Sequence, residues 1–274
     1  MFGRKDKFEI KSFEQFVKMR KAGLVVADTL SRIEREAVPG VTTGDLDRIA
    51  REELKRFGAT PSFLGYHGYP AVICSSVNDE VVHAIPNERA LADGDILSVD
   101  FGAIVDGWHG DSAVTIEIGT KIAAQSKLSA VTRESMWAGL AKCVAGNYLT
   151  DISHAVETSI RAEGDYGILE EYTGHGIGTK MHMDPSVPNY GPAGYGPQLQ
   201  VGMALAIEPM VTMGGKHVHT LADNWTVVTD DGSRASHWEH TVAITKDGPW
   251  VLTAHDGGAE YFKKHGISSP AERF

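Results

Sequence analysis

Two aspartates on either side of a predicted hairpin turn are the residues of this sequence best placed to bind a cation. Asp106 and Gly107 are flanked by segments rich in Val, Ile and aromatic residues, a strong signal for a two-residue β-hairpin turn. In that register Asp111 faces position 102, so Asp100 shares its face, roughly 7–8 Å away. Two carboxylates on a largely apolar face repel each other unless cations compensate them. The pair therefore predicts a metal site. The alternative is that one of the two aspartates is a turn residue and the other is a capping residue.

A glycine-rich stretch supplies a candidate imidazole ligand. His175 lies among three glycines, which let the backbone approach whatever the ring binds; the alternative is a hydrogen-bonded core or surface histidine. One imidazole among carboxylates suits Mn, Fe, Co or Zn better than Mg or Ca. His83 and His182 each follow an apolar segment and stand three residues before a proline. Neutral imidazoles there could donate hydrogen bonds to a substrate amide or a developing oxyanion.

The elements that must position these residues are those of an α+β protein. Residues 1–12 are interpreted as a polar N-terminal tail. One amphipathic helix is predicted from Ser12 to about Ala37, and a second over 46–57 with Thr43 or Asp45 as its cap. The predicted strands are 71–76, 81–85, 96–104 and 108–118.

The later part of the chain repeats the order of the first part. Helices are predicted over 126–144 and 152–163, and a shift of 106 residues places Asp45 on Asp151, the cap of the second of these helices. The pattern predicts two similar halves packed around a pseudo-two-fold axis, although chance similarity of two α+β segments is the alternative. The predicted halves span about 13–120 and 121–255 of a single domain, 13–274.

The duplication adds two acidic residues to the candidate site. A shift of 108 residues places Asp100 on Glu208, and a shift of 128 places Asp111 on Glu239. Four carboxylates, two from each half, would then converge where the strands of the two halves meet. Such a cluster is tenable only with bound cations, and hard divalent ions prefer oxygen ligands.

Charge and composition exclude several classes of protein. A net charge of −10 over 274 residues argues against a general nucleic-acid binder. Basic residues concentrate only near the N-terminus, at Arg4, Lys5, Lys7, Lys11, Lys18, Arg20 and Lys21. We interpret them as a solvated helix face and tail; the alternative is a docking patch for an acidic surface.

The cellular context is predicted from what the chain lacks. The two cysteines form no disulfide framework, and no apolar run approaches the roughly 20 residues of a membrane span. The first residues contain no signal-peptide core, so a cytoplasmic protein is predicted. No long heptad or apolar stripe argues for assembly, and a monomer is expected.

Several motifs together resemble the methionine aminopeptidases, a family within the pita-bread metallohydrolases. In chain order they are SVNDEVVHAIP (76–86), HGDS (109–112), GHGIG (174–178), His-x-x-Pro (182–185), IEPMV (207–211) and WEHTV (238–242). The resemblance runs from about residue 13 to 255. Only 31 positions separate Glu208 from Glu239, which leaves no room for the helical insertion of type II enzymes, so the chain is similar to type I.

The resemblance implies a dinuclear metal site and a peptide substrate. Two adjacent divalent ions would be held by Asp100, Asp111, His175, Glu208 and Glu239, with Asp111 and Glu239 bridging them. A hydroxide held by these ions would attack the first peptide bond. Glu208 would carry the proton, while His83 and His182 would bind the scissile amide and stabilise the tetrahedral intermediate.

The resemblance also implies a pocket for a methionine side chain. The residues at its positions are Tyr66, Tyr69, Cys74, Met181 and Trp225, a set that is usually core when judged from the residues alone. Met181 departs from the Phe common in bacterial relatives, and its flexibility still suits a thioether. The implied substrate is the N-terminus of a nascent polypeptide with a small second residue, and the basic N-terminal helix suggests ribosome proximity. The other histidines, interpreted mostly as surface or supporting residues, are His67, His109, His217, His219, His237 and His240.

Two alternatives remain for the function. An Xaa-Pro aminopeptidase or prolidase relative would share the fold, but such proteins usually carry a sizeable N-terminal domain, and here the first helix begins almost at once. A non-catalytic pita-bread protein would act as a binding or ribosome-associated module. Such proteins lose metal ligands, whereas all five are present here.

Overall fold

The first helix begins at the predicted cap. The structure is a computed structural model that describes residues 8–273. Helix α1 spans Phe13–Glu36; the Ser12 hydroxyl accepts a hydrogen bond from the backbone of Gln15, and the Gln15 side chain accepts one from the backbone of Ser12. This reciprocal capping box satisfies two donors that a helix start otherwise leaves free. The predicted boundaries of this helix are therefore confirmed.

Helices α2 (Thr43–Phe57) and α4 (Leu149–Glu163) begin three residues before their predicted starts. Thr42, rather than Thr43 or Asp45, caps α2, and Asp45 bonds back to the backbone of Thr42. Asp151 does the same at α4, where the backbone of Tyr148 donates to it. Each acidic residue is thus the third of its helix, and not the cap. Both helices have fifteen residues, and their starts differ by the predicted 106 positions.

Helix α3 is shifted toward the N-terminus relative to its prediction over 126–144. It spans Ala123–Leu140. After Leu140 the backbone changes to shorter turns, in which Lys142 donates to Gly139 and Cys143 donates to Leu140. Such three-residue turns commonly close a helix, which explains why α3 ends before the predicted Gly146 stop. A short helix near the C-terminus, α5, spans Ala259–Lys264.

Antiparallel strands form one large sheet and two small ones. The nine-stranded sheet has the order β1-β4-β5-β14-β9-β7-β8, with β2 also paired to β4 and β15 to β14. Its strands are β1 Thr60–Pro61, β2 Ile73–Val77, β4 Ile96–Val105, β5 Trp108–Glu117, β7 Gly174–Gly176, β8 Met183–Val187, β9 Ala204–Ile207, β14 Glu239–Thr245 and β15 Gly248–Val251. The small sheets have the orders β13-β10-β6 and β11-β12-β3. Their strands are β3 Glu80–Val82, β6 Gly167–Ile168, β10 Met210–Thr212, β11 Val218–Thr220, β12 Val227–Thr229 and β13 Ala235–His237.

The β4–β5 hairpin has the predicted register. Val105 pairs with Trp108 at the turn, and Asp111 pairs with residue 102. Asp106 and Gly107 both have positive φ, 51° and 79°, as the two central residues of a type I′ turn require. Since side chains alternate along each strand, Asp100 and Asp111 lie on the same face of the hairpin.

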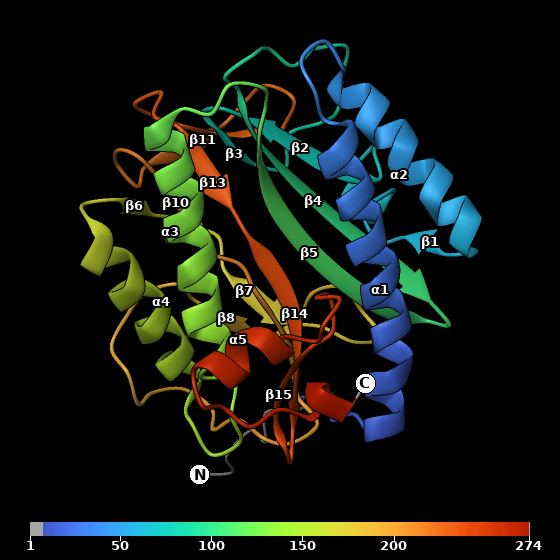
Figure 1. Ribbon diagram of the computed structural model, residues 1–274, viewed down its shortest axis with the longest axis vertical. Helices are drawn as coiled ribbons and strands as arrows, with labels where there is room; N and C mark the ends of the chain where they lie inside the picture. Colours follow the sequence, from blue (N-terminus) through green and yellow to red (C-terminus); the bar gives the residue numbers. More distant parts are fainter. Residues whose placement is uncertain (1–7, 274) are drawn as a thin grey trace.

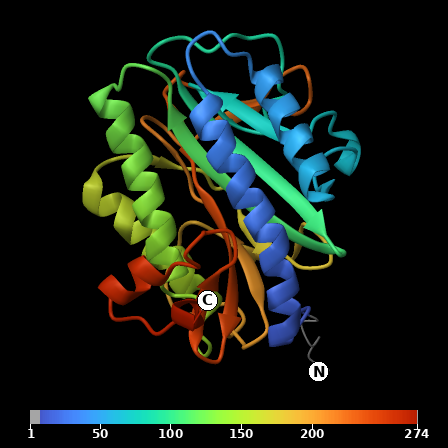
Figure 2. The ribbon, with the colours of Figure 1, turned by 45° about the vertical axis from the view of Figure 1, so that its right-hand side comes forward.

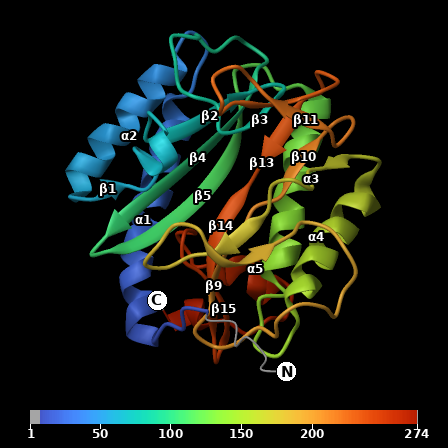
Figure 3. The ribbon, with the colours of Figure 1, turned by 180° about the vertical axis from the view of Figure 1, so that it is seen from behind.

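The helices cover the strands in two similarly built halves. Helix α1 packs against β4 and β5, and α3 packs against β10, β13 and β14; both cross in front of the strands (Figure 1, Figure 2). From behind, the strands lie in front of α1 and α3 (Figure 3). One apolar core lies between α1, α2 and strands β2, β4 and β5, and another lies between α3, α4 and strands β9 and β14. The predicted α+β fold with two similar halves is confirmed.

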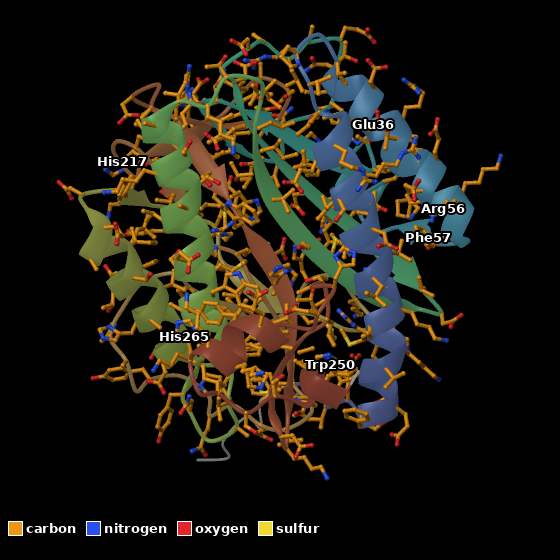
Figure 4. All side chains as sticks on the ribbon, in the orientation of Figure 1. Glu36, Arg56, Phe57, His217, Trp250 and His265 are labelled. Atoms are coloured by element: carbon orange, nitrogen blue, oxygen red, sulfur yellow. The ribbon has the colours of Figure 1, made fainter. Side chains whose placement is uncertain are left out.

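Strand β15 and the segment that follows it are anchored to α1. Trp250, labelled in Figure 4 beside the first turns of α1, stacks on Phe13 with ring centroids 5.6 Å apart. The guanidinium of Arg20 donates to four backbone carbonyls between residues 251 and 255. Arg20 is therefore a structural residue, and not part of a free basic surface. Within residues 8–273, no helix is long and apolar enough to span a membrane.

Candidate active site

A single cavity of about 280 Å³ brings together every residue predicted for the site. The predicted residues that line it are Tyr66, Tyr69, Cys74, His83, Asp100, Asp111, His175, Met181, His182, Glu208, Trp225 and Glu239. Phe63 and His67 also line the cavity but were not predicted as site residues. Their position on either side of Tyr66 in the chain is the signal that could have identified them.

Strand pairing explains why the five candidate metal ligands meet. Asp100 and Asp111 project from one face of the β4–β5 hairpin, and Glu239 opens β14, where it pairs with residue 113 of β5. On its other side β14 pairs with β9, which ends directly before Glu208, and β9 pairs with β7 at His175. The central strands β5-β14-β9-β7 therefore place ligands from both halves next to one another.

The donor atoms are close enough to share a cation. One ligand atom each from Asp111, His175 and Glu239 lies within 4.8 Å of the others. The His175 Nε2 atom is 3.4 Å from Oε1 of Glu208 and 4.0 Å from Oδ2 of Asp111. Within residues 8–273, buried carboxylate oxygens of Asp100, Asp111 and Glu239 have no hydrogen-bond partner. Orphaned carboxylate oxygens are costly unless a cation binds them, so these residues fit a divalent metal ion.

Electrostatics lead to the same conclusion. Burial, together with repulsion from neighbouring carboxylates, raises the pKa values of Asp100, Glu208 and Glu239 well above their ordinary range. Burial also raises the pKa of Asp111 to about 7. Burial lowers the pKa of His175 to about 3, which keeps its imidazole neutral and able to act as a ligand. Divalent cations would remove the repulsion that opposes ionisation of the four acids.

Two further histidines line the same cavity. His83 has a positive φ of 61°, a strained backbone conformation that is common at functional sites. Burial, followed by the proximity of His182, lowers the pKa of His83 to about 4. Burial also lowers the pKa of His182, whose Nδ1 lies 2.9 Å from the hydroxyl of Tyr66. Both rings are therefore neutral near pH 7 and can each donate one hydrogen bond into the cavity.

The remaining wall of the cavity is apolar and rich in sulfur. Tyr69 is buried, and its hydroxyl donates to a backbone carbonyl 3.0 Å away, so that the ring and not the hydroxyl is available to a ligand. Trp225 packs edge-on against Tyr69, with ring centroids 5.0 Å apart. Cys74 and Met181 are buried beside them, and burial raises the pKa of the Cys74 thiol. A neutral wall of aromatic rings and polarisable sulfur suits an unbranched apolar side chain.

His237 is a buried residue next to the site that sequence reasoning did not single out. It is 2% exposed, and its Nε2 lies 3.7 Å from Oε2 of Glu208. Burial, followed by the proximity of His83, lowers its pKa to about 3. His237 stands two residues before Glu239, and strand alternation could have placed it near the acids.

Known proteins resemble this chain in sequence and in fold. Metallopeptidase family M24 matches residues 17–246. Methionine aminopeptidase 1 of Mycobacterium tuberculosis is 54% identical over 241 residues, which cover 86% of this chain and 91% of that protein. The structure of methionine aminopeptidase from Thermotoga maritima has a TM-score of 0.89 and 41% identity, covering 91% of this chain and 100% of that one.

A more distant structural neighbour bears on the proline-specific alternative. Prolidase from Pyrococcus furiosus has a TM-score of 0.72 and 20% identity, and the likeness covers 90% of this chain and 65% of that one. At this identity the likeness shows the fold alone.

The chain, with its α+β pita-bread fold, belongs to metallopeptidase family M24 and, within it, to the methionine aminopeptidases.

Proposed function

We propose that this protein is a metal-dependent aminopeptidase that removes the N-terminal methionine from polypeptides with a small second residue. The observation that carries the proposal is the single cavity in which five metal-type ligands face a neutral wall of aromatic rings and sulfur. The family supports the same activity, since relatives with a similar sequence and fold are named methionine aminopeptidases.

We assign the metal site to Asp100, Asp111, His175, Glu208 and Glu239, which would hold two divalent ions with Asp111 and Glu239 between them. Carboxylates with one imidazole favour Co, Mn, Fe or Zn. When bound, such ions polarise a carbonyl and lower the pKa of a water molecule. The residues fit this role because three of the acids have carboxylate oxygens that no other group within residues 8–273 satisfies.

The other polar residues would handle the proton and the peptide. Glu208 lies 3.4 Å from the imidazole of His175 within the cluster of candidate ligands, so its carboxylate would be placed to take a proton and pass it to the leaving amine. His83 and His182 would donate hydrogen bonds to the scissile amide and to the oxyanion that develops from it. Since Tyr66 occupies Nδ1 of His182, its Nε2 is left for the substrate.

The apolar wall would bind the methionine side chain. Tyr69, Cys74, Met181 and Trp225 are mutually packed residues with no charge to complement a polar side chain. A long unbranched thioether fills such a site, whereas a charged first residue would lose its hydration without gaining a partner.

A peptide panel tests the proposed function. The protein is incubated with Met-Ala-Ser, with N-acetyl-Met-Ala-Ser, with Lys-Ala-Ser and with an Xaa-Pro tripeptide, and released amino acids are quantified. We expect free methionine from Met-Ala-Ser alone. Cleavage of the Xaa-Pro peptide instead would assign the protein to the proline-specific branch. If no amino acid is released from any peptide with any added metal ion, the enzymatic proposal is refuted, and the protein would act as a binding module.

Ribosome proximity is a further part of the proposal and rests on a smaller basic surface than the sequence predicts. Arg4, Lys5 and Lys7 lie outside the described residues. Lys11 is buried, and Arg20 is committed to backbone carbonyls, so Lys18 and Lys21 are the exposed cations left in the predicted set. Reversing both charges should weaken co-sedimentation with ribosomes at low salt, and unchanged co-sedimentation would contradict a role for this surface.

We also propose that the protein is a monomer. Size-exclusion chromatography tests this, and elution at the mass of a dimer would contradict it.

A further inference from the structure

Residues 8–11, which the sequence assigns to a loose tail, lie against the loop that joins two histidines of the site. We call residues 8–11 the N-terminal strap and residues 177–181 the histidine loop, because the loop runs from His175 on β7 to His182 before β8. The strap and the loop are about 170 residues apart in the sequence, so their contact belongs to the tertiary structure.

Lys11 provides the central contact of the strap. Its side chain is 3% exposed, and its ammonium donates to the backbone carbonyl of Ile177 at 2.6 Å. The same ammonium lies 3.3 Å from a carboxylate oxygen of Glu9. A buried ammonium is costly unless it is paired and hydrogen-bonded, so this contact is a specific, built feature of the fold.

Glu9 binds the histidine loop two residues further along, at Thr179. Both the backbone N–H and the hydroxyl of Thr179 donate to its carboxylate. Gly178 leaves the space for this contact, because a Cβ at that position would lie 2.0 Å from Glu9 and 2.6 Å from the Lys11 side chain. The backbone of Lys11 also donates to the carbonyl of Gly202 at 2.8 Å, which ties the strap to the turn before β9.

The opposite side of the histidine loop is held by the large sheet. The backbone of His109 on β5 donates to the carbonyl of Gly178 at 2.9 Å, and Ile177 donates to Ala204 of β9 at 3.1 Å. The loop is therefore fixed between the sheet and the strap. Its last residue, Met181, and the following His182 line the active-site cavity.

We propose that the N-terminal strap sets the position of Met181 and His182 in the cavity, with Glu9 and Lys11 as positioning residues for the reaction. Glycines flank Ile177 in the chain, so the loop backbone has wide conformational freedom once its contacts are removed. A small displacement of His182 would misplace the donor for the developing oxyanion. The effect on activity rests on the proposed function; the effect on the loop does not.

The first test compares Lys11→Met with Lys18→Met in the full chain loaded with Mn. Lys18 is an exposed lysine of α1 and serves as the matched control. We expect Lys11→Met to lower kcat for Met-Ala-Ser by about tenfold with a smaller change in KM, because misplacement of a catalytic group acts mainly on the chemical step. Lys18→Met should match the parent. Unchanged kcat in Lys11→Met would overturn the proposal.

A double-mutant cycle tests whether the strap acts through His182. In a His182→Ala background, adding Lys11→Met should lower kcat by less than twofold, because the group that the strap positions is already absent. An equal, tenfold loss in both backgrounds would show that Lys11 acts elsewhere and would overturn the proposed route. Glu9→Gln is the milder second variant, and it should reproduce part of the loss if Lys11→Met does not fold.

Hydrogen exchange tests whether the strap holds the histidine loop, and the measurement does not depend on catalytic activity. Amides of residues 177–182 should exchange at least several times faster in Lys11→Met than in the parent or in Lys18→Met, while amides of β4 stay protected. Equal exchange of the loop in all three proteins would refute the strap. If the parent releases no methionine, the proposed function fails, and the exchange measurement still decides whether the strap holds the loop.

Discussion

Asp111→Asn should stabilise the metal-free protein at neutral pH while it abolishes metal-dependent activity. Asp111 is 3% exposed, and one of its carboxylate oxygens has no hydrogen-bond partner in the part of the chain that the structure describes. Burial raises its pKa from 3.8 to about 7 although the backbone of Ser112 bonds to it. Asn keeps the shape of the side chain without the charge. The substitution therefore separates the effect of the buried charge on folding stability from its contribution to metal-dependent activity.

The sign and size of the effect follow from the pKa of Asp111. Because folding raises this pKa, the folded protein binds more protons than the unfolded chain between pH 3.8 and about 7, and its stability falls as pH rises through that window. At about 1.4 kcal/mol for each pKa unit, ionised Asp111 costs the metal-free fold roughly 4 kcal/mol above pH 7 and almost nothing below pH 4. The Asn variant should gain up to that amount at pH 8.

Urea unfolding of chelator-treated protein at a series of pH values between 4 and 8.5 measures this difference. Asp165→Asn, at an exposed position, is the matched control and should follow the parent at every pH. Added Mn should stabilise the parent more than the Asp111→Asn variant, which reverses their order. A variant that is less stable than the parent by the same amount at pH 4 and pH 8 would refute the electrostatic reasoning.

Two further predictions concern contacts that hold the halves and helices in place. Gly110→Ala should lower the free energy of unfolding by about 3 kcal/mol, because its Cβ would lie 2.7 Å from the backbone of Gly23 in α1. Gly215→Ala, whose Cβ meets nothing closer than 3.5 Å, is the control, and equal urea midpoints would contradict the prediction. Arg20→Met should cost about 2–3 kcal/mol by removing the guanidinium that donates to four carbonyls, whereas Lys18→Met should leave thermal unfolding unchanged.

The site could be predicted from the sequence where its geometry depends on local chemistry. Asp106 and Gly107 determine a two-residue turn, and a two-residue turn determines the register of both strands, so the shared face of Asp100 and Asp111 follows from a short segment. The duplication then extended the argument to Glu208, because similar strands in the two halves place Asp100 and Glu208 at equivalent positions. Helix starts were less certain, since neighbouring residues such as Thr42 and Thr43 are equally good caps.

Residues that act through distant contacts could not be predicted. Lys11 stands in a polar segment that favours a solvated side chain, and only the tertiary structure places its ammonium on the carbonyl of Ile177. Arg20 likewise belongs to an amphipathic helix and gains its carbonyl partners from the far end of the chain.

The most direct test of the central claim is release of methionine from Met-Ala-Ser by metal-stripped protein titrated with Mn, Co, Fe and Zn, with Asp111→Asn measured alongside. We predict no release before metal is added, release restored by at least one of the four ions, and no restoration in the variant. Release that persists in the stripped protein, or that is restored equally in Asp111→Asn, would contradict a catalytic metal site built on the acids of both halves.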